Sequence, residues 1–167
     1  DDDFQKDLGK VHQFLADIQR NEKKDAPAKM LAVIAACRAY LDDAVRAPAR
    51  HSLMDALLST IDPYMTDEGA QEVAETIQRV LSSAERLIHA ATCVGGFNRG
   101  NAWQRTYMLW ALIHGLDHFR KRDRLQPEHL RVEQLLQASL RTLFIGWGAT
   151  SDNIKEAFEL FEQYVKL

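Results

Sequence analysis

The sequence predicts an all-α fold, a compact bundle of about six to seven helices. Apolar residues recur every three or four positions in almost every segment, and no segment alternates apolar and polar residues over the length of a strand. The 167 residues are 46% hydrophobic and 27% charged, a composition typical of one folded domain. We therefore predict a single domain over residues 1–167. A module excised from a larger protein and a short α-solenoid of helix pairs are the alternatives.

The first half of the chain predicts three helices. Residues 4–18 carry an amphipathic apolar stripe, and a second stripe over 26–46 has Pro27 in its first turn. A short third helix over 53–61 should stop before Pro63, because proline disfavours helical geometry in the residue that precedes it.

The second half predicts four more helices. The longest should begin after Thr66, a candidate cap, and end near Gly95. The next follows Asn101 and is apolar on all sides, which predicts that other helices surround it. Pro127 should lie in the first turn of the sixth helix, and Ser151 should open the terminal one.

Charge and cysteine content limit the function classes. The formal net charge of −3 means that contact with nucleic acid would depend on a local basic patch. Cys37 and Cys93 lie in apolar helical patterns, which predicts two reduced, buried thiols, with a disulfide between them as the alternative. The chain has no signal-peptide pattern and no apolar run long enough to span a membrane, so we expect a cytoplasmic protein.

A basic cluster follows the all-apolar helix. Arg120, Lys121, Arg122 and Arg124 place four cations in five positions. Cations are favourable near the exposed carbonyls of a helix C-terminus, but four exceed what capping requires. The cluster therefore predicts a surface that binds an acidic partner or phosphate.

The loop GGFNRGNA, residues 95–102, resembles the phosphate-binding pattern of two glycines separated by four residues. Asn101 and Ala102 stand where that pattern needs lysine and a hydroxyl, which favours a simple glycine-rich turn between helices. Phe97 and Arg99 would form a partner-binding tip on this turn if the phenylalanine were exposed.

Two histidines four residues apart, His114 and His118, have a spacing that can bind a metal ion. The nearest additional ligand pair, Glu85 and His89, would be offset by roughly 10 Å along the neighbouring helix. We therefore expect no metal ion and no cofactor. Instead, His114 should pack beside Trp110 and hydrogen-bond across the bundle, and His118 should be solvated.

Arg122 and His129 resemble the R-x4–6-H signature of the HEPN ribonucleases, which are small helical bundles. The resemblance covers eight residues. It implies that this arginine and histidine would act at the scissile phosphate of RNA, across a dimer.

These observations favour a non-enzymatic adaptor or scaffold domain without catalytic residues, which acts through the basic cluster and the adjacent loop tip. Its expected partner is another protein with an acidic surface or an amphipathic helix, and nucleic acid is a less favoured partner. A HEPN-like or other phosphate-handling bundle and a histidine-based metal protein are the alternatives, and the oligomeric state is left open. The residues predicted to bind the partner are Phe97, Arg99, Arg120, Lys121, Arg122 and Arg124.

Overall fold

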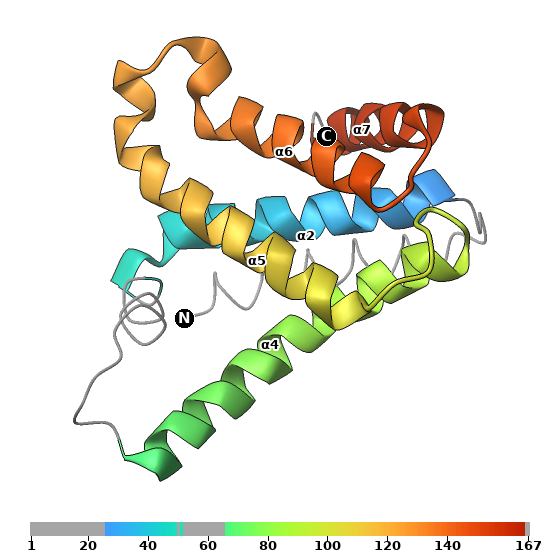
Figure 1. Cartoon of the computed structure of the whole chain (residues 1–167). Helices are drawn as coiled ribbons and strands as arrows, with labels where there is room; N and C mark the ends of the chain where they lie inside the picture. Colours follow the sequence, from blue (N-terminus) through green and yellow to red (C-terminus); the bar gives the residue numbers. More distant parts are fainter. Residues whose placement is uncertain (1–25, 50, 52–65, 166–167) are drawn as a thin grey trace.

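The computed structural model describes residues 26–49, 51 and 66–165. They form five α-helices and two short 3-10 helices, and this part of the chain contains no strand, so the predicted all-α bundle is confirmed. The helices predicted over 4–18 and 53–61 lie outside the described residues. The elements are α2 (Ala26–Arg46), α4 (Asp67–Cys93), α5 (Ala102–Phe119), η1 (Arg120–Leu125), η2 (Glu128–Leu130), α6 (Val132–Gly146) and α7 (Ser151–Val165) (Figure 1).

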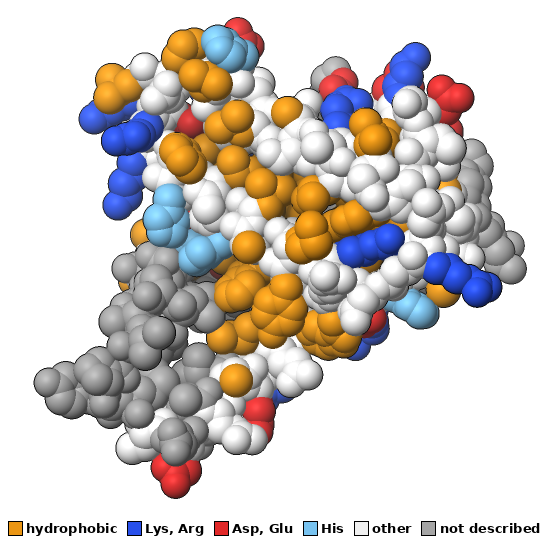
Figure 2. Space-filling view, viewed as in Figure 1, with side chains coloured by type: hydrophobic (Ala, Val, Ile, Leu, Met, Phe, Trp, Pro, Cys, Tyr) orange, Lys and Arg blue, Asp and Glu red, His pale blue; other side chains and the backbone are white. Residues whose placement is uncertain are grey.

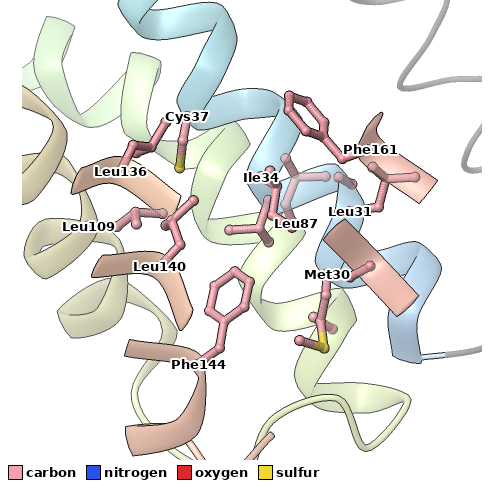
Figure 3. Close-up of a cluster of buried hydrophobic side chains, with 14 of the residues drawn as sticks. Met30, Leu31, Ile34, Cys37, Leu87, Leu109, Leu136, Leu140, Phe144 and Phe161 are labelled. Atoms are coloured by element: carbon pink, nitrogen blue, oxygen red, sulfur yellow. The ribbon is translucent and has the colours of Figure 1, made fainter. Parts of the chain in front are cut away.

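Helix α2 lies at the centre of the bundle. Five consecutive residues, Met30 to Ile34, are buried, which happens only when neighbours cover a helix on all sides. Helices α4, α5 and α7 all pack against it. Side chains from α2, α4, α5, α6 and α7 meet in one apolar core (Figure 3).

Helix α5 is not surrounded, which corrects the expectation from its composition. Leu109 and Ile113 face the core, but the side chains of Tyr107 and Met108 are each 47% exposed. The apolar residues on the outer side of α5 therefore form a surface rather than a second core face.

Two of the predicted helix caps are confirmed. The Thr66 hydroxyl accepts a hydrogen bond from the Gly69 N–H, and the Asn101 side chain accepts one from the Gln104 N–H. These bonds satisfy backbone donors that have no partner within the first turn of a helix.

The turn between α4 and α5 is held by aromatic packing. Phe97 is only 3% exposed, and its ring lies 5.1 Å from Phe144 and 5.3 Å from Trp147 between centroids. The buried guanidinium of Arg105 lies over the rings of Phe97 and Trp147. The predicted glycine-rich helix–helix turn is therefore present, and it is attached firmly to the end of α6.

The predicted start of the sixth helix at Pro127 is wrong. Pro127 has an extended ψ of 150°, and two 3-10 helices occupy the chain from Arg120 to Leu130 before α6 begins at Val132. Asp123 explains the later start, because its Oδ1 accepts a hydrogen bond of 3.0 Å from the Val132 N–H. One acidic residue inside the basic cluster thus supplies the cap for α6.

Burial predicts which leucines support this fold. Leu140 is fully buried, whereas Leu125 is 76% exposed. We expect Leu140→Ala to lower the free energy of unfolding by about 2 to 5 kcal/mol, because it leaves a cavity in the core. The same change at Leu125 should stay within about 0.5 kcal/mol. Urea unfolding followed by circular dichroism measures both, and equal losses would contradict the assigned core.

Candidate functional site

A cavity of about 190 Å³ lies where α2, α4 and α5 meet. Helices α4 and α5 diverge from the turn that joins them, and α2 crosses beside both (Figure 1). The cavity occupies the space within this arrangement. Its lining residues are Val33, Ala36, Cys37 and Tyr40 from α2, Ile77, Leu81, Ser83, Ala84 and Leu87 from α4, and Thr106, Leu109, Trp110 and Ile113 from α5.

The cavity wall is almost entirely apolar. Among the lining residues that the structure describes there is no aspartate, glutamate, lysine, arginine or histidine. The Thr106 hydroxyl donates a 2.8 Å hydrogen bond to the carbonyl oxygen of Ala102 in its own helix. Its proton is therefore already used within the helix and is not offered to a ligand. The wall can therefore receive an apolar molecule by excluding water, and it offers little to an ion.

Cys37 contributes a neutral thiol to the wall. It is only 1% exposed, and desolvation by burial raises its pKa from 9.0 to about 12. Both cysteines are free, so the predicted reduced state is confirmed and the alternative disulfide is wrong. Cys93 is exposed rather than buried, in contrast to the sequence-based expectation.

A polar cluster lies at one end of the cavity, beside Tyr40. The Tyr40 hydroxyl lies 3.1 Å from Nδ1 of His114, and the Tyr40 ring meets the ring of His51 edge-on at 5.4 Å between centroids. His51 is also buried, with Nε2 3.2 Å from a carboxylate oxygen of Asp117. This cluster joins the end of α2 to the last turns of α5.

Arg120 completes this junction and so differs from its expected surface role. Its Nη2 donates a 2.7 Å hydrogen bond to the carbonyl oxygen of Leu41, and its Nε lies 3.1 Å from Oδ1 of Asp117. The arginine therefore holds α5 against α2. Lys121, Arg122 and Arg124 remain exposed around it.

The remaining predicted contact residues do not form one surface with this cluster. Phe97 is buried, so the exposed aromatic tip is absent. Arg99 is exposed, but it precedes α5 whereas the basic cluster follows it. The 18 residues of α5 separate the two by roughly 27 Å. A role in partner binding for the six residues stays a prediction, and the predicted adjacency of tip and cluster is wrong.

The histidine pair behaves as expected from the sequence. His114 packs 5.8 Å from Trp110 between ring centroids and reaches Tyr40 across the bundle, and His118 is exposed. The described residues contain no group of three or more side chains of metal-ligand type. None of the described helices is long and apolar enough to cross a membrane.

The fold and cavity define a class of protein, a helical bundle with an apolar pocket large enough for a small molecule. Residues 33–143, well over half of the chain, match the family model described as tetracyclin repressor-like, C-terminal domain. The chain belongs to this family. No curated protein and no solved structure matches it.

This family membership overturns two predictions. The adaptor function and the HEPN-like ribonuclease function are both wrong, because a repressor-like C-terminal domain indicates a regulatory, ligand-binding role. Arg122 and His129 instead lie exposed on two separate 3-10 helices. The cavity itself was missed because its lining residues have the same spacing as ordinary core residues on three different helices.

The two cysteines should differ sharply in reactivity. We expect the anionic disulfide reagent dithionitrobenzoate to modify Cys93 quickly at about pH 8 and to modify Cys37 only as the protein unfolds. The reason is that burial keeps the Cys37 thiol protonated up to a pH of about 12. Absorbance of the released thionitrobenzoate measures the rate. Cys93→Ser should remove the fast phase, and a fast phase that survives in this variant would contradict the assignment.

Proposed function

We propose that this chain is the ligand-binding regulatory domain of a transcription regulator, and that its effector occupies the cavity between α2, α4 and α5. The family match supports the regulatory role. The single observation that carries the site assignment is the cavity of about 190 Å³ with an apolar wall. Apolar side chains around such a space lose packing contacts, so a cavity of this size is unfavourable without an occupant.

The packing of α4 and α5 provides a way for the ligand to act. At the turn between them, the two helices are held together by Phe97 and by its contacts with Trp147 and Phe144. Away from this turn, Ile77 and Leu81 of α4 line the cavity. A ligand that contacts both helices therefore favours one spacing between them, which shifts the population of conformations.

A matched pair of alanine substitutions on α4 tests this site. Ala84 lines the cavity, and Ala74 is exposed on the same helix. We expect a screen of small molecules by thermal unfolding to yield compounds that raise the melting temperature of the wild-type chain. Ala84→Leu should lower the affinity for these compounds at least tenfold because it fills the cavity, and Ala74→Leu should leave the affinity unchanged.

The regulatory role is tested in the intact regulator. We expect an effector found in the screen to change expression of a reporter from a promoter that the full-length protein binds, and Ala84→Leu should remove this response. Effectors whose binding is insensitive to Ala84→Leu would contradict the site. Binding without any transcriptional response would contradict the regulatory role.

A second observation favours pairing of two copies of the chain. Hydrophobic side chains gather along α5 and α6 on one face of the molecule (Figure 2). Met108 is 47% exposed and Ile145 is 59% exposed. Between the two helices lies a shallow hollow without charged side chains, lined by Met108, Leu112, Ala138, Ser139, Thr142 and Leu143.

This face suits a homodimer in which α5 and α6 of one copy pack against those of the other about a twofold axis. Domains of this family typically dimerise. The pairing explains why α5 is apolar on its outer side as well as on its core side.

A charge placed in this face should separate the two copies. We expect light scattering on the wild-type chain to give the mass of two chains, and Met108→Lys to give the mass of one, because pairing would bury an ammonium group. Val45→Lys is the control, since Val45 is an exposed apolar residue on α2. A wild-type monomer, or a Met108→Lys dimer, would contradict this interface.

A further inference from the structure

We infer that the ligand of this cavity is a small, uncharged and predominantly apolar molecule of about the size of a substituted single ring. This inference rests on the proposed function, because it specifies the chemistry of the effector at the same site. It follows from the charge of the wall, from the state of the nearby charged groups, and from the volume of the cavity.

The wall excludes ionised ligands. No lining residue in the described part of the chain carries a formal charge near neutral pH, and burial keeps the thiol of Cys37 in its protonated form. An ion that enters the cavity would lose its hydration without gaining a counter-ion. That loss is among the largest penalties in protein energetics, so a neutral ligand is strongly preferred.

The charged groups beside the Tyr40 end of the cavity already have partners. Arg120 donates to the carbonyl oxygen of Leu41 and contacts the carboxylate of Asp117. The second oxygen of Asp117 lies 3.2 Å from His51. An ionic ligand could use these groups only by breaking the junction between α2 and α5. The cluster at this end therefore supplies no counter-charge to a ligand unless these contacts break.

The volume of the cavity indicates the size of the group that it can enclose. A buried apolar cavity of about 150 Å³ accommodates benzene. The cavity in this chain, at about 190 Å³, is slightly larger. It therefore has room for a single ring with a short substituent, or for a branched aliphatic molecule of similar volume. Trp110 and Tyr40 provide aromatic surface in the wall.

Four probes of nearly equal size test the inference. Toluene and benzyl alcohol are uncharged, whereas benzoate and benzylammonium are ionised near neutral pH. We expect both neutral probes to raise the melting temperature of the full chain by about 5 to 10 °C at roughly 100 times their dissociation constants. Calorimetry should give dissociation constants at least tenfold higher for both ions. Ala84→Leu should remove the binding of the neutral probes, and Ala74→Leu should not.

The outcomes separate this inference from the proposed function. If the ions bind as tightly as the neutral probes, and Ala84→Leu abolishes that binding, the effector site stands and the inference about charge is wrong. In a second outcome, the screen yields an effector whose binding is lost in Ala84→Leu, while the neutral probes do not bind or bind equally well to this variant. That result would also overturn the inference about ligand class. A screen without any ligand of any class would instead remove the proposed function.

Discussion

The burial of α2 on all sides over Met30 to Ile34 is the constraint on which the rest of the structure depends. A helix whose residues Met30 to Ile34 are all buried needs neighbours on every side, and α4, α5 and α7 supply them. The ends of these neighbours are then held by specific contacts. Phe97 attaches the α4–α5 turn to Trp147, and Arg120 attaches the last turn of α5 to the carbonyl of Leu41. These contacts therefore fix α5 at both of its ends, and the cavity lies between them.

The cavity arises from small side chains at a junction of three helices. Along α2, Ala36 and Cys37 face this junction, and Ser83 and Ala84 face it from α4. Larger residues at these positions would fill the space, as they do in the core beside Leu140 and Phe144. A cavity costs the folded state dispersion contacts, in general roughly 24 cal/mol for each Å³. A chain that keeps small residues here gives up stability that a functional ligand can restore on binding.

The sequence predicts the helices well and the site poorly, for different physical reasons. Apolar spacing and local caps determine the helices, so the bounds of α2 and the caps at Thr66 and Asn101 can be read directly. The start of α6 depends on the hydrogen bond from the Val132 N–H to Asp123, nine positions earlier in the sequence. Rules that use only the apolar spacing and the neighbouring cap residue do not predict this bond. The cavity depends on which small residues meet in space. Periodicity shows only that they face inwards, and it does not distinguish a filled junction from an empty one.

The all-round apolarity of α5 has a functional consequence that goes beyond packing. One side of the helix, with Leu109 and Ile113, lines the cavity, and the other side exposes Met108 in the proposed pairing face. Because a helix moves as a rigid body, a shift of α5 that accommodates a ligand would also move the residues of the proposed pairing face. Under the two proposals, ligand binding and pairing would be linked thermodynamically, and each would change the affinity of the other by the same factor. Helix α5, which the sequence predicts to be surrounded by other helices, thus lies between the cavity and the proposed pairing face.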